Sequence, residues 1–270
     1  MSTAVARPET VDAFLGGRVE AVQPDDGRHR SGLEAVLLSA AMAPSFAGTL
    51  VDLGAGVGVA GMCAAARCPR ARVVLVERDS DAIAAARVAL ARPANRAFSD
   101  RVSVVAADIS APETERIAAG LRRASAGAVV VNPPFHREGE RTTSPISARA
   151  AAHVLGEGGL DPWFRAAASV LKPDGRLIVV FRADGLDEFL AALAGRFGAA
   201  TVLPIHPRAG LPAHRILVRA IKGSGAGPAI LPGLALHGET GGSYLPQVEA
   251  ILRDGAGLED VHPAWGDERG

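Results

Sequence analysis

The chain has 270 residues, of which 48% are hydrophobic, and this composition excludes a disordered protein because such a chain can bury a sizeable core. Basic and acidic side chains both number 29, so the zero net charge argues against binding of nucleic acid through strong overall basicity. Cys63 and Cys68 have the spacing of neither a zinc site nor a disulfide framework, and no signal peptide or membrane span is predicted. We therefore expect a cytoplasmic protein that binds neither a metal nor a membrane.

The charges are distributed unevenly along the chain. Residues 51–222 hold 23 basic and 16 acidic side chains, whereas residues 223–270 hold 2 basic and 7 acidic ones. We expect an N-terminal extension over 1–48 with one helix near 33–42, a central domain over 49–222, and an acidic tail over 223–270 with one helix near 246–253. The tail has three possible arrangements: it covers a ligand face, pairs with the arginine-rich domain, or hangs free.

From residue 49, short β-branched runs alternate with longer alanine-rich runs, which is typical of an α/β protein with a mostly parallel sheet and helices on both faces. Only ten residues separate the last two predicted strands, too few for a helical crossover, so the final strand is predicted to be antiparallel. Ser80 and Asp161 are the predicted N-caps of their helices. The predicted strands are 49–53, 72–77, 102–106, 128–131, 177–181, 200–204 and 215–221, and the predicted helices are 59–67, 80–91, 112–123, 161–171 and 186–196.

A glycine-rich loop follows the first predicted strand, with the sequence Asp52-Leu53-Gly54-Ala55-Gly56-Val57-Gly58. Glycines at such a point let the backbone approach a ligand closely, while the next helix presents free N–H groups. Gly56, Gly58 and Gly61 also satisfy the dinucleotide fingerprint, so the glycines alone do not choose between cofactors. Asp52, at the strand end, would repel a pyrophosphate and suits a ligand that carries an ammonium group.

Two further acids lie at predicted strand tips. Glu77 ends the second strand, where a carboxylate can accept hydrogen bonds from both hydroxyls of a ribose. Asp108 closes the third strand, where it can accept a hydrogen bond from the amine of an adenine. Because ligands bind at the carboxyl ends of strands in such sheets, these acids indicate a cofactor that contains adenosine, either NAD or S-adenosylmethionine.

The fourth predicted strand is followed directly by Asn132-Pro133-Pro134-Phe135, the predicted catalytic residues. A planar exocyclic amine is a poor nucleophile because its lone pair is delocalised. If the Asn132 side-chain oxygen and the Pro133 carbonyl accept its two N–H groups, the nitrogen is held toward tetrahedral geometry with its lone pair facing an electrophile. Phe135 would stack on the acceptor base, a contact worth ~1–3 kcal/mol.

In this order, the glycine loop, the two acids and the Asn-Pro-Pro-Phe tetrapeptide resemble class I S-adenosylmethionine-dependent methyltransferases that act on exocyclic amines. Over roughly residues 20–255, the chain resembles more specifically the bacterial tRNA1(Val) (adenine(37)-N6)-methyltransferase family. The segments that carry this closer resemblance are 23–24, 29–38, 151–153 and 212–218. Members of that family often carry Tyr where this chain has His29 or Phe135, and Asp where it has Glu34. Asn-Pro-Pro with an aromatic residue also occurs in ribosomal RNA guanine N2 methyltransferases and in glutamine N5 methyltransferases that act on release factors.

The resemblance implies a Rossmann-like seven-stranded sheet with an antiparallel last strand, S-adenosylmethionine as cofactor, and RNA, with tRNA expected, as the partner. By this carry-over residues 52–58 hold the methionine moiety, Glu77 the ribose and Asp108 the adenine, and Arg30 approaches the methionine carboxylate. Arg137, Arg141 and Arg149 either follow RNA phosphates or form a solvated loop. The alternatives are the guanine N2 and glutamine N5 activities; an NAD-dependent oxidoreductase would leave the tetrapeptide without a role.

Overall fold

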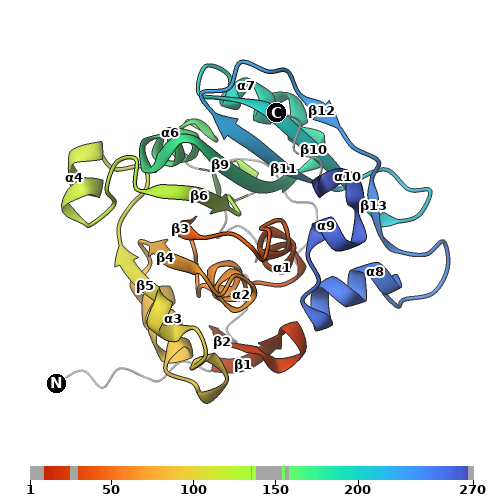
Figure 1. The fold of residues 1–270 in the computed structure, drawn as a ribbon, viewed down its shortest axis with the longest axis horizontal. Helices are drawn as coiled ribbons and strands as arrows, with labels where there is room; N and C mark the ends of the chain where they lie inside the picture. The colour runs from red at the N-terminus through yellow and green to blue at the C-terminus, as the bar shows by residue number, and fades with distance from the viewer. Residues whose placement is uncertain (1–8, 25–29, 135, 138–153, 156–157, 267–270) are drawn as a thin grey trace.

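A computed structural model describes residues 9–24, 30–134, 136–137, 154–155 and 158–266. Its centre is a nine-stranded sheet. The strands are β3 (Gly48–Leu53), β4 (Ala71–Glu77), β5 (Val102–Ala106), β6 (Ala126–Val131), β9 (Leu171–Arg182), β10 (Phe197–Arg208), β11 (Arg215–Lys222), β12 (Ala229–Ile230) and β13 (Leu234–His237). They lie in the order β12-β10-β11-β9-β6-β3-β4-β5, and β13 also pairs with β10 (Figure 1).

The seven strands from β10 to β5 form the predicted Rossmann-like arrangement. Adjacent strands among β9, β6, β3, β4 and β5 are parallel. β11 is antiparallel to both of its neighbours, β9 and β10. The α/β class and the antiparallel last strand are therefore confirmed, and the reason is the short connection between β10 and β11, which leaves no room for a crossover helix.

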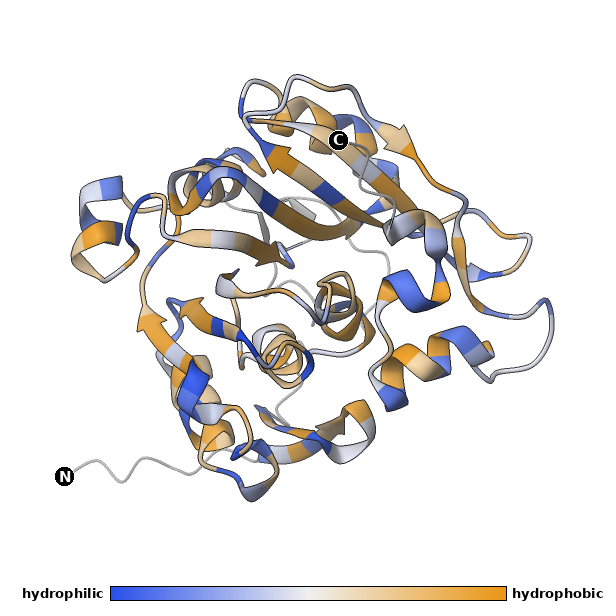
Figure 2. Cartoon of the chain, in the orientation of Figure 1, coloured by the Kyte–Doolittle hydropathy of each residue, from blue (hydrophilic) through white to orange (hydrophobic). Residues whose placement is uncertain are grey.

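Helices cover both faces of the sheet. On one face lie α1 (Leu33–Ala40), α2 (Val59–Arg67) and α3 (Ser80–Leu90), and on the other lie α6 (Asp161–Val170) and α7 (Leu186–Leu193) (Figure 1). Strand residues alternate between the two faces, so that Leu50 and Val130 join one core cluster and Val51 and Val129 the other. Figure 2 shows the inner strands coloured mostly as hydrophobic residues. Within the described ranges, no helix is long and apolar enough to cross a membrane.

Several helix ends differ from prediction, and α7 ends at Leu193 instead of residue 196. Asp79, not Ser80, caps α3, since its carboxylate accepts hydrogen bonds from the N–H groups of residues 81 and 82. Asp161 is the first residue of α6 and pairs with Arg165 one turn later. The helix predicted at 112–123 is the shorter α4 (Glu113–Ala118), because Gly120 adopts a positive φ of 110° and the N–H of Leu121 closes back on the carbonyl of residue 116.

The N-terminal extension contains a hairpin that the sequence pattern did not predict. β1 (Glu9–Phe14) and β2 (Val19–Pro24) pair antiparallel around the short turn η1 (Leu15–Gly17). The buried Asn95, in the turn η2 (Pro93–Asn95), bonds the N–H and the carbonyl of Glu20 at 3.0 and 2.7 Å, much as a neighbouring strand would. A second short turn, η3 (Ser99–Arg101), leads into β5.

The tail packs onto the domain up to residue 266, so the described part of it does not hang free. β12 and β13 run parallel to β10 at the sheet edge. The tail also contains the short helices α8 (Pro246–Glu249), η6 (Ala250–Asp254), α9 (Leu258–Val261) and α10 (Pro263–Gly266), and a short turn η5 (Ala183–Gly185) precedes α7 in the central domain. The Trp265 indole is buried, donates to the carbonyl of Ala41 at 3.2 Å and lies under the guanidinium of Arg219. Arg67 donates to the carbonyl of Gly255 at 3.0 Å. The predicted helix near 246–253 corresponds to α8 and η6.

Candidate active site

The candidate site lies at the carboxyl ends of the parallel strands. Leu53, the last residue of β3, is paired with Val76 on one side and with Val131 on the other. The residues that follow them, Gly54, Glu77 and Asn132, therefore lie at one level on three adjacent strands. The chain thus brings together the glycine loop, the second acid and the start of the tetrapeptide.

The glycine loop is anchored on β4. The N–H groups of Gly54 and Ala55 both donate to the carbonyl of Val76 at 2.9 Å. Gly61, the third glycine of the dinucleotide fingerprint, has a structural use instead: a side chain there would collide with Leu75, and its N–H donates to Asp52 Oδ2 at 2.9 Å. Close packing of α2 on the sheet thus accounts for that glycine without a pyrophosphate.

Asp52 lies beneath α2 and is 2% exposed. Burial raises its pKa from 3.8 to about 7, against the lowering effect of the Gly61 hydrogen bond, and the negative charge of Glu77 raises it further. The carboxyl group is therefore poised between its neutral and charged forms at neutral pH. A cation bound nearby would favour the charged form.

Glu77 ties the glycine loop to the tip of β4. Its Oε2 accepts the N–H of Gly56 at 2.8 Å, and its Oε1 accepts the N–H groups of Arg78 and Asp79 at 2.7 and 2.9 Å. A carboxylate has about four lone-pair sites, so these three bonds leave one site for a hydroxyl group of a ligand.

Asp108 follows β5 at the same edge of the sheet. Its Oδ1 accepts the N–H and hydroxyl of Ser110 at 2.8 and 2.6 Å, and its Oδ2 lies 3.1 Å from Arg78 Nη1. Burial raises the pKa of Asp108, but the bonds from Ser110 and Arg78 outweigh it, so the pKa lies below its usual 3.8. Asp108 is therefore a charged acceptor at neutral pH.

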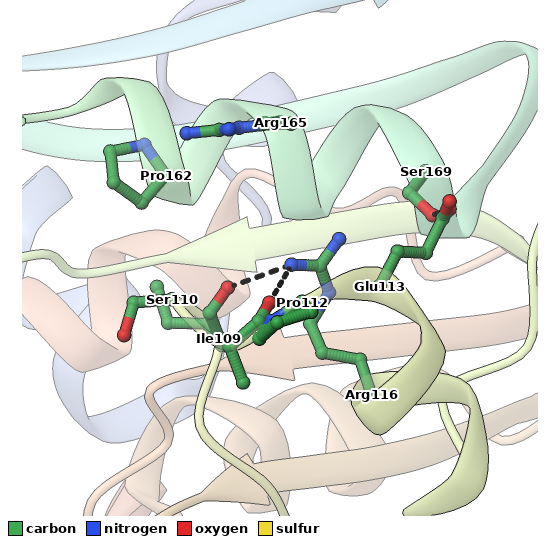
Figure 3. Close-up of a pocket in the computed structure, with 9 residues that line it drawn as sticks. Ile109, Ser110, Pro112, Glu113, Arg116, Pro162, Arg165 and Ser169 are labelled. Carbon is green, nitrogen blue, oxygen red and sulfur yellow. Dashed lines mark hydrogen bonds between the residues drawn. The ribbon is translucent and has the colours of Figure 1, made fainter.

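A cavity of about 440 Å³ lies beside this loop, between the segment 109–113 and α6 (Figure 3). Arg116 Nη1 reaches the carbonyls of Ile109 and Ala111 at 3.2 and 2.6 Å, which fixes the loop that carries Asp108. Two other charged groups of the lining are also paired, Glu113 with Arg123 and with the Ser169 hydroxyl, and Arg165 with Asp161. The charged side chains that line the cavity are thus engaged with neighbouring residues.

Asn132 comes directly after β6 and is half-buried. Its side-chain oxygen Oδ1 is buried and accepts no hydrogen bond from any described residue. A buried polar oxygen without a partner costs free energy, roughly 1–3 kcal/mol, unless a ligand satisfies it. Pro133 is buried and Pro134 is half-buried, whereas Phe135 lies outside the described residues, as do Arg141 and Arg149.

A short pair of strands lies between the tetrapeptide and α6 in the sequence. β7 (His136–Arg137) pairs in parallel with β8 (Val154–Leu155), a few residues before α6 begins. Trp163, on the first turn of α6, lies against the glycine loop: a Cβ built on Gly54 would come 2.5 Å from its Cη2. Sequence reasoning missed Trp163, because an aromatic residue at a helix start gives no sign of this contact.

Arg30 is placed among polar groups of the N-terminal hairpin. Its Nη2 lies 2.6 Å from Asp12 Oδ2 in β1. Gln23 bonds the same segment at Ser31, accepting its N–H at 2.7 Å and donating to its carbonyl at 3.1 Å. Through Asp12 and Ser31 these contacts hold Gln23 and Arg30 in one polar cluster, and the role of Arg30 toward a carboxylate stays a prediction.

Two flanking motifs that are far apart in the sequence meet at this edge of the sheet. Glu34 Oε1, in the first turn of α1, lies 3.4 Å from Arg215 Nε at the start of β11. Arg215 is in register with Arg182 at the end of β9, so the pair joins α1 to the carboxyl edge two strands from Asn132. In the described part of the chain, no group of three or more His, Cys, Asp or Glu side chains is arranged to hold a metal ion.

Comparison with known proteins agrees with this arrangement. The family model of the methyltransferase small domain matches residues 33–206. A tRNA1(Val) (adenine(37)-N6)-methyltransferase from Porphyromonas gingivalis is 31% identical over 163 residues, which span 59% of this chain and 61% of that protein. The enzyme of the same name from Aeromonas hydrophila is 30% identical over 196 residues, or 71% of this chain and 76% of that protein.

Among solved structures, a protein from Agrobacterium tumefaciens described as a predicted O-methyltransferase superimposes with a TM-score of 0.71. It is 33% identical in sequence, and the match covers 83% of this chain and 98% of that one. The resemblance inferred from the motifs is thereby confirmed at the level of the family. The chain belongs to the methyltransferase small domain family, whose model spans more than half of its length.

Proposed function

We propose that this protein is an S-adenosylmethionine-dependent methyltransferase that acts on an exocyclic amine in RNA, with the N6 atom of adenine 37 in tRNA as its target. The observation that carries the proposal is the Oδ1 of Asn132, which is buried and accepts no hydrogen bond from the residues that the structure describes, one strand away from the first glycine of the loop. A buried acceptor at that point suits a ligand that donates an N–H group.

The residues at the edge of the sheet fit S-adenosylmethionine. The backbone of the Gly54 to Gly58 loop is open to close approach by a ligand, Glu77 retains one acceptor site for a ribose hydroxyl, and Asp108 is a charged acceptor for the adenine amine. Asp52, beneath the loop, adds a carboxyl group whose charged form a nearby cation favours. When bound, S-adenosylmethionine supplies an electrophilic methyl group.

Asn132 and Pro133 orient the acceptor. The Asn132 oxygen and the Pro133 carbonyl accept the two N–H groups of the amine, which turns its lone pair away from the ring and toward the glycine loop. Pro133 is buried, so its carbonyl is held in place before substrate arrives. The methylated nitrogen then loses a proton to water, so no side chain is required as a general base.

The substrate assignment rests on similarity and on charge. Relatives that share about 30% of their aligned residues with this chain are named for adenine 37 of tRNA. An unpaired base in an anticodon loop requires little unstacking energy to enter a pocket. The surplus of seven basic side chains over residues 51–222 suits contact with RNA phosphates.

One labelling experiment tests the proposal. The purified protein is incubated with S-adenosylmethionine carrying a tritiated methyl group and, separately, with total tRNA, total ribosomal RNA and release factors, and the products are identified by mass spectrometry. N6-methyladenosine in tRNA is the expected product. Methylguanosine in ribosomal RNA, methylglutamine in a release factor or a 2′-O-methyl ribose would contradict the substrate assignment, and no labelled product in any fraction would overturn the activity.

A further inference from the structure

Trp163 is the residue of the site whose role neither the motifs nor the family match explains. It lies on the first turn of α6 and is half-buried, while the edge of its indole ring lies against the α-carbon of Gly54. Gly54 has a positive φ of 69°, so the loop presents bare backbone to the ring. Trp163 therefore packs on the glycine loop itself.

The strand register places this contact beside the tetrapeptide. Gly54 follows Leu53, which is paired with Val131, and Asn132 follows Val131. Adjacent strands lie about 4.8 Å apart, so the indole stands within side-chain reach of the point where Asn132 would hold an amine. β7, which follows the tetrapeptide, pairs with β8, which precedes α6 in the chain. This pairing ties the segment after Asn132 to the segment before Trp163.

Resting on the proposed function, we propose that the Trp163 indole is one wall of the subsite for the acceptor base and stacks on its planar ring. An aromatic wall beside a backbone-lined loop favours flat heteroaromatic amines, because a base offers a π-face for stacking and a tetrahedral alkylamine does not. Trp163 thus acts by contact with the substrate, and it restricts the acceptor to planar amines.

The two tryptophans of the chain make the proposal testable by fluorescence. Trp265 is 2% exposed and lies in the tail, so it serves as an internal reference. We expect tRNA added to the protein saturated with S-adenosylhomocysteine to quench the emission of the wild type, and to leave that of Trp163→Phe unchanged. Quenching by S-adenosylhomocysteine alone, with no further change on adding tRNA, would make Trp163 a cofactor contact and overturn the proposal.

Kinetics provide the second readout. Trp163→Ala should raise the KM for tRNA at least about tenfold, whereas Trp163→Phe, which keeps an aromatic face, should stay within about threefold. Binding of S-adenosylhomocysteine by both variants should stay within about threefold, which also shows that they fold. Leu190→Ala, a truncation in α7 on the same face of the sheet, is the matched control and should leave the KM unchanged.

The outcomes separate the two proposals. An active wild type whose KM for tRNA is unchanged in Trp163→Ala overturns the subsite and leaves the proposed function standing. A Trp163→Ala variant that loses tRNA affinity while Trp163→Phe retains it supports the subsite. A wild type that methylates no RNA overturns both.

Discussion

The carboxylates at the carboxyl ends of β3, β4 and β5 accept hydrogen bonds from their own surroundings, whereas the side-chain oxygen of Asn132, directly after β6, accepts none from the described residues. In the first region, which we call the donor half, Asp52, Glu77 and Asp108 are bonded to Gly61, Gly56 and Ser110 respectively. In the second, the acceptor half, Asn132 Oδ1 is buried and unpartnered. The donor half is thus organised before any ligand binds, and the acceptor half is left to be completed by one.

This difference has an energetic meaning. Polar groups that are satisfied internally stabilise the fold, so substitutions in the donor half should change stability as well as binding. A buried oxygen without a partner costs free energy instead, so its removal should lower activity and leave stability unchanged or higher. Substitutions in the two halves should therefore affect stability and activity differently.

Asn132→Ala should lower the rate of methyl transfer by about 10²–10³-fold or more, because it removes an acceptor aimed at the reacting amine. The affinity for S-adenosylmethionine should stay within a few fold, and the free energy of unfolding should stay level or rise, by about 3 kcal/mol at most, because the unpaired buried oxygen is removed. Single-turnover kinetics, calorimetric titration and chemical denaturation measure the three quantities. Near wild-type turnover by Asn132→Ala would contradict the proposed role of Asn132 in orienting the amine.

Asn95 is the matched control for that variant. Its side chain is also buried, but it makes hydrogen bonds to Glu20 and to the carbonyl of Ala89. Asn95→Ala should therefore lower the free energy of unfolding by more than about 1 kcal/mol while the folded fraction keeps its turnover number. Equal stability losses in the two asparagine variants would contradict the claim that Asn132, unlike Asn95, makes no hydrogen bond that stabilises the fold.

Asp52→Asn should change how stability depends on pH. The folded state raises the pKa of Asp52 from 3.8 to about 7, so the native protein holds this proton more tightly and loses stability as pH rises through that window. The loss amounts to about 4 kcal/mol at most. Because the amide that this substitution introduces cannot ionise, the variant should gain stability relative to the wild type between about pH 4 and about pH 7.

Denaturation of both proteins at several pH values measures this difference. The absolute stability of the variant is not the readout, because the new amide also changes the bond to Gly61. Parallel pH profiles for wild type and variant would show that Asp52 is not held as a buried, proton-binding group in the donor half.

Gly54→Ala should lower the free energy of unfolding by about 1–3 kcal/mol, since a methyl group there combines a positive φ with a collision against Trp163. Gly56→Ala is the control: its φ is also positive, at 55°, but a Cβ there meets nothing within 4 Å. Adding Trp163→Ala to Gly54→Ala should recover the collision part of the cost. Equal costs for the two glycine variants would contradict the contact between Trp163 and the glycine loop.

Ser110→Ala should have the smallest effect. It removes one hydrogen bond to a charged acceptor that is partly exposed, so we expect a loss of about 1 kcal/mol or less in stability and a few-fold loss in affinity for S-adenosylhomocysteine. The pKa of Asp108 should rise toward its usual value, which titration by NMR would detect. An unchanged pKa would mean that Arg78 and the backbone N–H of Ser110 suffice.

Most of the central domain could be predicted from the sequence, because local pattern and tertiary structure agree there. The strand at 102–106 and the helix at 59–67 have the predicted bounds, since β-branched and alanine-rich runs follow one another without ambiguity. The β1–β2 hairpin and the strands of the tail could not be predicted, because they are short and are fixed by distant partners: Asn95 bonds β2, and β10 pairs with β12 and β13.

The same distinction applies to the site. Because predicted strands alternate with predicted helices, the sequence places the glycine loop, Glu77 and the tetrapeptide at one edge of a parallel sheet. The observed register puts Gly54, Glu77 and Asn132 at one level of that edge. The contact of Trp163 with Gly54 depends on how α6 packs, which no local pattern encodes. The zero net charge likewise describes the whole chain, while the tail that balances the basic domain is packed onto it through Trp265 and Arg67.

The orientation of the acceptor amine by Asn132 and Pro133 is tested most directly by a crystal structure with S-adenosylhomocysteine and an adenosine-containing oligonucleotide. The quantity to measure is the distance from Asn132 Oδ1 to the exocyclic nitrogen of the base. A hydrogen bond of about 2.7–3.2 Å is expected, with the Pro133 carbonyl accepting the second hydrogen of the amine. A base bound in the site whose amine lies beyond hydrogen-bond distance of both oxygens would contradict the proposed orientation.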